Sequence, residues 1–160
     1  MRLWRIEKSV FAKEVRSGNG ARLYGGRWNS PGRPAIYCAG SLSLAMLEVL
    51  AHINTEEETG EKRVFFTVNV DDKLVEEVAA PDLPRGWRSA LNMKPCRRLG
   101  DAWLASGNSV ALRVPSALVQ GEFNCILNPA HPQYRKGAIW SVGRLLRIDS
   151  RLFQNLGKRD

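Results

Sequence analysis

Residues 25–48 read GGRWNSPGRPAIYCAGSLSLAMLE, and the composition of this stretch changes twice along its length. Its first part, residues 25–32, is rich in glycine and contains a proline, which predicts a short strand entering a turn. The apolar run Ala35–Cys38 is typical of a buried strand. The residues after it have helical spacing, so the stretch predicts a strand followed directly by a helix.

This predicted helix has both a start signal and an apolar face. Ser41 or Ser43 can accept a hydrogen bond from a free backbone N–H group of the first turn and so cap the helix. The apolar positions that follow at helical spacing are Leu44, Leu47 and Ala51. The helix should end near Ile53, ahead of an acidic loop at Glu56–Glu58.

The rest of the chain predicts more short strands than helices. Val64–Val70 is the clearest strand, because aromatic and β-branched residues favour a pleated surface. A second helix should begin near Pro95, a residue accepted in a first turn, and end before Gly107. The apolar face of that helix would be Leu99, Ala102 and Trp103. Further strands are expected at Leu3–Ile6, Ser109–Val114, Phe123–Leu127 and Val142–Ile148, with a helical turn at Lys8–Val15 and a break at Ser17–Gly20. The pattern predicts a single α+β domain over residues 1–160, with a mixed or antiparallel sheet core flanked by helices.

Length and composition fit one soluble globular domain. A chain of 160 residues can bury roughly 70% of its unfolded surface, so it needs no metal or disulfide to close a core. The hydrophobic fraction of 44% and the charged fraction of 25% are near globular averages. No apolar run reaches the roughly 18 residues of a membrane span, and no apolar stretch resembles a signal peptide. We therefore expect a cytoplasmic protein with no membrane contact.

Cysteine and histidine are too few and too scattered for a disulfide framework or a metal site. Cys38, Cys96 and Cys125 are far apart and odd in number, which fits reduced interior thiols. Neither His52 nor His131 has a cysteine or histidine at a zinc-like interval. We expect no metal ion.

The net charge of +8 is distributed unevenly. Residues 1–37 hold eight Lys and Arg against two acids, residues 48–82 three against ten, and residues 83–160 thirteen against four, giving +6, −7 and +9. A basic surface can attract nucleic acid, a nucleotide phosphate or an acidic protein. One hypothesis is therefore a basic nucleic-acid-binding protein, with the five tryptophans stacking on bases. Because the chain has no RNA-recognition, zinc-finger or helix-turn-helix signature, we favour an enzyme that does not bind nucleic acid directly.

Three side chains near the start of the chain suit a ligand site, and each also has a structural interpretation. Arg27 follows two glycines, where a ligand can approach the backbone and a guanidinium suits phosphate, but it could be an ordinary surface arginine. Glu48 shares a helix flank with Leu44, where a carboxylate needs a partner unless it reaches solvent. Tyr37 could stack on a flat ring or pack in the core.

Two polar residues in the second half complete the candidates. Ser116 follows a proline at a strand end, and Asn124 lies in the neighbouring predicted strand, although both could serve turn geometry. A Gly-x-Ser-x-Gly elbow, a P-loop and a Gly-x-Gly-x-x-Gly motif are all absent from the sequence. A serine hydrolase and the common nucleotide-binding motifs are therefore disfavoured.

Taken together, these motifs resemble the RES-domain family, which is named for an arginine, a glutamate and a serine. The resemblance rests on GARLYGGRWN at residues 20–29, followed by Pro31-Gly32, Ile36-Tyr37, Leu44-Ala45 and Glu48-Val49-Leu50. Val114-Pro115-Ser116, Asn124 and Asn128–Pro132 resemble the second half of the same pattern. The resemblance covers nearly the whole chain.

The resemblance implies a fold similar to that of ADP-ribosyltransferases and a site that consumes NAD⁺ as substrate without a metal. It implies catalytic roles for Arg27, Glu48 and Ser116, and NAD⁺-binding roles for Arg27, Trp28, Tyr37 and Asn124. Ser109, also near a strand, is the alternative serine. Some members have tyrosine where this chain has Trp28.

The resemblance also implies a biological role, that of the toxin of a type II toxin–antitoxin system. Such an enzyme cleaves the nicotinamide–ribose bond, with water as acceptor in a glycohydrolase, phosphate in a phosphorylase, or a protein in an ADP-ribosyltransferase. We rank loss of free NAD⁺ above protein modification, because no part of the sequence suggests a protein-docking module. The implied partner is an antitoxin with a helix-turn-helix DNA-binding domain, in a complex that contains a homodimer of the toxin.

Overall fold

The computed structural model describes residues 1–53 and 56–153, and its strands form one mixed sheet. Seven of the eight strands follow the order β4-β5-β6-β2-β1-β3-β7, and the eighth, β8, also pairs with β3. They are β1 (Arg2–Lys8), β2 (Ile36–Ala39), β3 (Arg63–Val70), β4 (Val75–Glu77), β5 (Ala111–Pro115), β6 (Phe123–Leu127), β7 (Ala138–Trp140) and β8 (Arg144–Leu146). Only β4 and β5 pair in parallel among these described strands, so the mixed sheet expected from the sequence is present.

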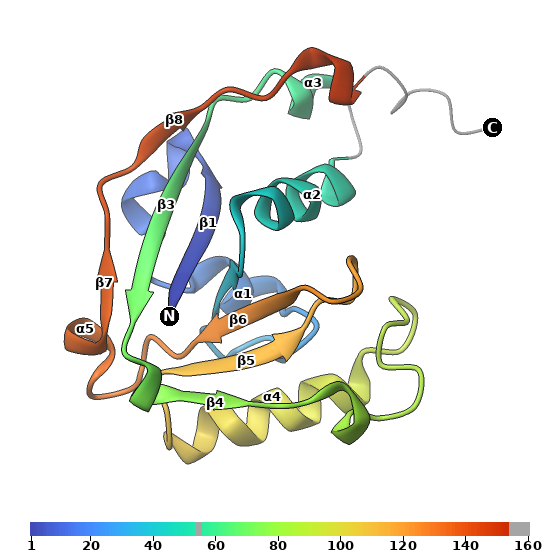
Figure 1. The fold of residues 1–160 in the computed structure, drawn as a ribbon, viewed down its shortest axis with the longest axis vertical. Helices are drawn as coiled ribbons and strands as arrows, with labels where there is room; N and C mark the ends of the chain where they lie inside the picture. Colours follow the sequence, from blue (N-terminus) through green and yellow to red (C-terminus); the bar gives the residue numbers. More distant parts are fainter. Residues whose placement is uncertain (54–55, 154–160) are drawn as a thin grey trace.

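The helices flank this sheet, as Figure 1 shows. They are α1 (Asn19–Tyr24), α2 (Leu42–His52), α3 (Glu56–Thr59), α4 (Lys94–Ser106) and α5 (Tyr134–Gly137), with 3-10 helices η1 (Ser9–Glu14), η2 (Asp72–Leu74), η3 (Ala80–Asp82) and η4 (Ser150–Phe153). Across the described ranges, no helix has the length and apolar character needed to cross a membrane. The two long helices, α2 and α4, are the ones that frame the candidate site.

The sheet is almost divided between β1 and β2. Among the described residues, Trp4 and Ala39 are the one pair that joins these strands, whereas β1 pairs with β3 from Arg2 to Lys8. The part formed by β4, β5, β6 and β2 runs in a different direction from the part formed by β1, β3, β7 and β8 (Figure 1). The sheet is therefore strongly curled.

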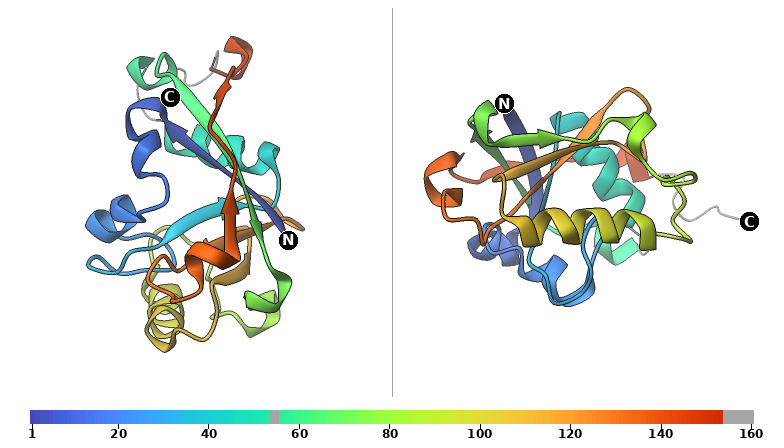
Figure 2. Two further views of the ribbon diagram at one scale, coloured as in Figure 1. Left: turned by 90° about the vertical axis from the view of Figure 1, so that its left-hand side faces the viewer. Right: turned by 90° about the horizontal axis from the view of Figure 1, so that it is seen from below.

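Helices α2 and α4 pack on the same face of the sheet. Paired residues of neighbouring strands point to the same side, so this face carries adjacent rows of side chains. One row is Leu112, Ile126 and Tyr37, and the next is Val114, Asn124 and Ala39. The first row packs with α4, which runs alongside β4 and β5 in the right-hand view of Figure 2, and Ala39 packs with α2. Asn124 consequently lies on the part of the face between the two helices.

The opposite face carries the larger core, in which residues from both parts of the sheet meet. Its buried residues include Leu3, Ile36, Cys38, Val68, Cys125 and Leu127. All three cysteines of the chain are buried and free of disulfides, as predicted. Burial raises the pKa of Cys38 to about 12 and also raises the pKa values of Cys96 and Cys125. The thiols are interior packing groups that stay protonated at neutral pH.

The boundaries of α2 confirm the predicted helix. Ser41 is the N-cap, and its side chain accepts a hydrogen bond from the Leu44 backbone N–H at 3.1 Å, so Ser41 rather than Ser43 is the cap. The helix ends at His52, next to the predicted Ile53. Beyond it, the acidic segment predicted as a loop forms the short helix α3.

The boundaries of α4 are also confirmed, but its buried face differs from the prediction. Gly107 has φ of +61° at the C-cap, the left-handed conformation that glycine accepts without strain. Trp103 is buried as predicted, whereas Ala102 is exposed and Gly100 is buried in its place. The apolar pattern missed Gly100 because its burial comes from contact with backbone, not from an apolar side chain.

Other differences from the predicted elements involve short segments. The break predicted at Ser17–Gly20 overlaps the start of α1, and Gly25–Gly32 is an irregular loop without the predicted strand. The strand predicted over Val142–Ile148 shrinks to β8, while β4 and β7 were not predicted. Strands of three residues are too short for an alternating pattern, and pairing with neighbouring strands stabilises them.

Candidate functional site

Arg27 lies on a loop, residues 25–33, that connects α1 to β2 and that we call the arginine loop. The loop folds around the Asn29 side chain, which is 0% exposed. Its amide nitrogen donates to the backbone oxygens of Ala21 at 2.8 Å and Arg33 at 2.9 Å. The Gly26 backbone N–H also donates to the Asn29 backbone oxygen at 2.9 Å. The loop is therefore an ordered structure with its own buried polar centre.

Tyr37 supports the arginine loop from the sheet. Its hydroxyl donates to Asn29 Oδ1 at 2.7 Å and accepts from the Trp28 backbone N–H at 3.0 Å. Burial raises the pKa of Tyr37 above its ordinary value, although the hydrogen bond from Trp28 opposes this effect. A Cβ atom on Gly26 would overlap the Tyr37 hydroxyl. The hydroxyl thus serves the loop, and the predicted contact with nicotinamide would have to come from the ring.

Helix α4 holds the same loop from the other side. Arg97 Nε donates to the Gly26 backbone oxygen at 2.8 Å, and Asp101 Oδ1 accepts from the Ser30 backbone N–H at 2.9 Å. Gly100 lies so close to Trp28 that a Cβ atom there would overlap the Trp28 carbonyl oxygen. These residues occupy one stripe of the helix, because positions three and four apart are neighbours on its surface.

The Arg27 side chain is half-buried and anchored to backbone oxygens. Its Nη1 donates to the carbonyl oxygens of Trp87 at 2.6 Å and Ser89 at 3.0 Å. The Trp87 ring in turn packs against the Trp28 ring, with centroids 6.3 Å apart. This anchoring fixes the direction of the guanidinium and leaves Nε and Nη2 for another acceptor. Arg27 can therefore present a preoriented cationic donor to an anion.

Glu48 and Asn124 meet on the sheet face between α2 and α4. Asn124 Nδ2, from β6, donates to Glu48 Oε1, from α2, at 2.7 Å. Both side chains are half-buried. This amide is the partner that a carboxylate beside the apolar Leu44 requires. The hydrogen bond holds a carboxylate in a defined direction while leaving it accessible, which suits stabilisation of a developing positive charge.

The two candidate serines have different surroundings. Ser109 is buried, and its hydroxyl accepts from Trp103 Nε1 at 2.8 Å and donates to the Ala111 backbone oxygen at 3.2 Å. Ser116 is also buried, and its hydroxyl accepts from the backbone N–H groups of Leu118 at 3.1 Å and Val119 at 3.0 Å. Ser109 is thus a core residue. Ser116 stabilises the turn after β5, and a catalytic role for it stays a prediction.

The structure gathers five of the predicted site residues into two groups on the face of the sheet that α2 and α4 cover. Glu48 and Asn124 form one group, and Arg27, Trp28 and Tyr37 form the other through the arginine loop. Trp28 is 3% exposed, so its ring packs in the core and its backbone N–H positions Tyr37. Sequence reasoning missed four residues that hold the loop, namely Asn29, Arg97, Gly100 and Asp101. A glycine inside a predicted helix was the one available signal, since it often marks a close backbone contact.

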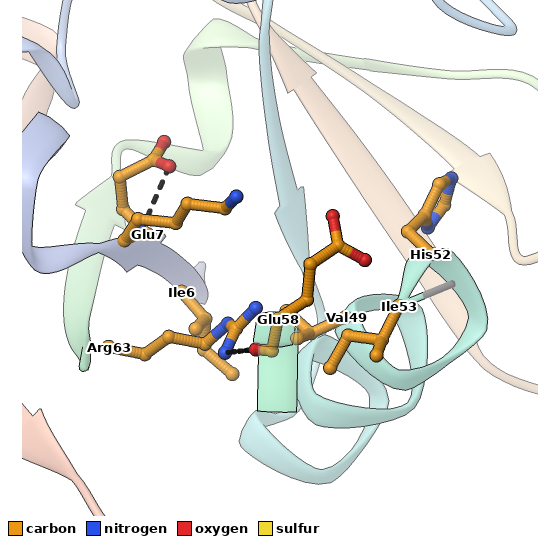
Figure 3. Close-up of a pocket in the computed structure, with 8 residues that line it drawn as sticks. Ile6, Glu7, Val49, His52, Ile53, Glu58 and Arg63 are labelled. Carbon is orange, nitrogen blue, oxygen red and sulfur yellow. Dashed lines mark hydrogen bonds between the residues drawn. The ribbon is translucent and has the colours of Figure 1, made fainter. Parts of the chain in front are cut away.

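Two hollows flank this region. One, of about 410 Å³, opens at the ends of β4 and β5 and includes Val114, the β-sheet partner of Asn124. The other, of about 160 Å³, lies between the C-terminal end of α2 and β1 and is drawn in Figure 3. Its cations Lys8 and Arg63 both pair with Glu61. Because those charges are already compensated and no predicted site residue lines it, the smaller hollow is not favoured as a substrate site.

In the part of the chain that the structure describes, no three His, Cys, Asp or Glu side chains are grouped to hold a metal ion. The polar groups that the structure places at the candidate site are Glu48, Asn124 and the guanidinium groups of the arginine loop region.

The architecture defines the class of protein as a single α+β domain built on a curled mixed sheet. The RES domain family matches residues 2–147, and the chain belongs to this family. It is 38% identical over 153 residues to "Toxin Res" of Photorhabdus laumondii, covering 95% of this chain and 97% of that protein. It is 36% identical over 134 residues to "Prs ADP-ribosylating toxin" of a Sphingobium species, covering 81% and 83% of the two chains.

A mycobacterial protein is related in both sequence and structure. "NAD(+) phosphorylase MbcT" of Mycobacterium tuberculosis is 34% identical over 97 residues, which cover 57% of this chain and 50% of that protein. A chain of the crystal structure of the M. tuberculosis MbcT-MbcA toxin-antitoxin complex matches with a TM-score of 0.74 and 24% identity, over 97% of this chain and 87% of that one. This likeness confirms the predicted fold class.

Proposed function

We propose that this protein is the toxin of a toxin–antitoxin pair and that it consumes cytoplasmic NAD⁺ by cleaving the nicotinamide–ribose bond. The observation that carries the proposal is the Glu48 carboxylate, held by Asn124 at 2.7 Å between two helices of a RES domain. The names of the Photorhabdus, Sphingobium and mycobacterial relatives support a toxin that acts on NAD⁺ or transfers from it.

The site can promote this cleavage through electrostatics. As the bond between nicotinamide and C1 of the ribose breaks, positive charge develops on the ribose, and nicotinamide leaves as a neutral molecule. A carboxylate at Glu48 stabilises that charge more in the transition state than in the ground state, where the ribose carries less of it. Arg27 would bind the diphosphate or a ribose hydroxyl, and the Tyr37 ring would orient nicotinamide. Ser116 would supply a hydrogen bond within the substrate site.

The acceptor of the ADP-ribosyl group distinguishes three versions of the reaction. Water gives ADP-ribose, inorganic phosphate gives ADP-ribose phosphorylated at C1 of the ribose that carried nicotinamide, and a nucleophilic protein side chain gives an ADP-ribosylated protein. The mycobacterial name supports phosphate, and the Sphingobium name supports a protein acceptor. Glu48 could assist all three reactions. We place hydrolysis or phosphorolysis of free NAD⁺ first and ADP-ribosylation of a protein second, because no part of the sequence suggests a protein-docking module.

The purified protein is expected to convert NAD⁺ to nicotinamide. Chromatography of the products, with and without phosphate, separates hydrolysis from phosphorolysis, and labelled NAD⁺ with cell extract detects a modified protein. A Glu76→Gln protein, changed at an exposed carboxylate of β4, is a suitable control for the site variants. No release of nicotinamide under any of the three conditions would contradict the enzymatic proposal.

The alternative of a nucleic-acid-binding protein has weaker support. None of the five tryptophans, all within the described residues, is exposed, and Trp28 and Trp103 are buried in the core. Exposed aromatic rings are what a single strand needs for stacking. Binding that falls steeply with salt, with no loss of NAD⁺, would favour this alternative.

A toxin of this kind needs a partner, which we propose to be an antitoxin with a helix-turn-helix DNA-binding domain in a complex with a toxin homodimer. The basic segments 1–37 and 83–160 would attract an acidic terminal segment of the antitoxin towards Arg27, where it would compete with the diphosphate of NAD⁺. The toxin should be coexpressed with its genomic neighbour, and NAD⁺ turnover compared before and after truncation of that segment. Tight binding without inhibition, or normal growth of cells with abundant toxin alone, would contradict the proposal. Light scattering of the complex tests the homodimer.

A further inference from the structure

Arg97 lies in the first turns of α4 and reaches the arginine loop. Its Nε donates to the backbone oxygen of Gly26, the residue immediately before Arg27, at 2.8 Å. The side chain is half-buried, so the guanidinium is held against the loop and yet remains accessible. Its Nη1 and Nη2 groups are left for another acceptor.

The Arg27 guanidinium lies at the same junction between loop and helix. Its Nη1 and the Sγ of Cys96, the residue before Arg97, donate to the same Trp87 backbone oxygen, at 2.6 Å and 3.7 Å. The two Arg27 hydrogen bonds to Trp87 and Ser89 hold it in place there. Both guanidinium groups are therefore held where the arginine loop meets the first turn of α4.

These two arginines differ from others in their partners. Arg5, Arg33, Arg63, Arg113 and Arg151 each have a carboxylate oxygen within 4.0 Å. Within the described ranges, Arg27 and Arg97 have none. Exposed arginines such as Arg98 also lack one, but Arg27 and Arg97 are half-buried and anchored by backbone oxygens. Asp101, one helical turn after Arg97, is engaged by Ser30 and Arg33. Two neighbouring cations without a counter-charge repel each other, and an anion that binds both relieves that repulsion.

A diphosphate has the charge and the acceptor oxygens to do this. Guanidinium groups bind phosphate oxygens through charge-assisted hydrogen bonds, often in pairs. We propose that Arg97 is a second cationic residue of the substrate site, which binds the diphosphate of NAD⁺ together with Arg27 while its Nε holds Gly26. This inference rests on the proposed function, since it takes a dinucleotide as the substrate.

The test compares Arg97→Gln with Arg98→Gln, which removes the same charge from the next, exposed residue of α4. ADP-ribose binding is measured by calorimetry, and kcat and KM are measured for NAD⁺. Since a hydrogen bond to a charged group contributes about 10- to 100-fold in affinity, Arg97→Gln should weaken ADP-ribose binding and raise KM by at least roughly 10-fold. The kcat should change far less, and Arg98→Gln should match the parent.

Hydrogen exchange of the Trp28 amide, which is bonded to Tyr37, separates ligand contact from support of the loop. Arg97→Lys keeps a cation and should recover part of the lost affinity. If Arg97→Lys and Arg97→Gln bind ADP-ribose equally weakly, and hydrogen exchange of the Trp28 amide accelerates in both, Arg97 only positions the loop. The proposed contact between Arg97 and the ligand would then be refuted. Where Arg97→Gln does not fold, the comparison of Arg97→Lys with Arg98→Lys decides, because only the former should weaken ADP-ribose binding.

The outcome for the parent protein separates this inference from the proposed function. A parent that consumes NAD⁺, with an Arg97→Gln variant of equal ADP-ribose affinity, would refute the role of Arg97 alone. A parent that neither binds ADP-ribose nor releases nicotinamide would refute the proposed function, and the role of Arg97 with it.

Discussion

Replacement of Glu48 by glutamine should lower the kcat for NAD⁺ cleavage on the order of 10²–10³-fold while leaving the melting temperature close to that of the parent. The amide is nearly the same size as the carboxylate but carries no charge to stabilise the positively charged ribose. The hydrogen bond from Asn124 can be kept, because the glutamine oxygen also accepts. The measurement is the initial rate of nicotinamide release together with a thermal unfolding curve.

Two companion variants make this result specific. Asn124→Ala removes the group that orients the Glu48 carboxylate but leaves the charge in place. It should therefore lower kcat less than Glu48→Gln does. Glu76→Gln neutralises an exposed carboxylate of β4 and should leave turnover unchanged. A Glu48→Gln protein with the parent's kcat would show that Glu48 is a structural residue whose carboxylate reaches solvent. The proposed mechanism would then have to be abandoned.

Gly100→Ala is expected to have the second large effect, on both stability and turnover. In an ordinary helix this change would stabilise the fold by up to about 1 kcal/mol. Here the new Cβ would overlap the Trp28 carbonyl oxygen, and such overpacking typically costs about 1–3 kcal/mol. The arginine loop must move away from α4 to relieve it, and displacement of a site group by about 1 Å can reduce the rate by roughly 10²-fold. Thermal unfolding and the kcat/KM for NAD⁺ measure the two effects.

Gly20→Ala is the matched control, because Gly20 also lies in a helix and the added Cβ would meet nothing within 4 Å beyond its chain neighbours and the backbone of its own helix. It should be neutral or slightly stabilising and keep full turnover. If Gly100→Ala behaved like Gly20→Ala, α4 would not hold the loop at Trp28. Reduced stability with unchanged turnover would separate the loop contact from the site.

Local sequence patterns were enough to predict the larger elements. The strand over Phe123–Leu127 matches the structure at both ends. Helix α2 begins at the predicted serine cap, and α4 begins next to the predicted Pro95 and ends just before Gly107. These signals act within a few residues of the backbone groups they affect, so the sequence contains them in full. The same holds for the motifs that indicated the RES domain, since a family pattern is itself a linear one.

Contacts between distant residues were not predictable in this way. Glu48 was a candidate because a carboxylate on an apolar flank needs a partner, but Asn124, 76 residues away, became that partner through the pairing of β2 with β6. Tyr37 was assigned to the ligand, whereas its hydroxyl supports the arginine loop.

The sequence by itself thus determined the α+β class and the family, and it indicated the candidate residues of the site, because these depend on local periodicity, caps and motifs. The tertiary structure decided how the arginine loop is held, through Tyr37 of the sheet and through Arg97 and Gly100 of α4. It also decided the short strands β4 and β7, which form by pairing with β5 and β3. The physical reason is that hydrogen bonds and close packing between distant segments form only after the chain has folded, and no local spacing specifies them.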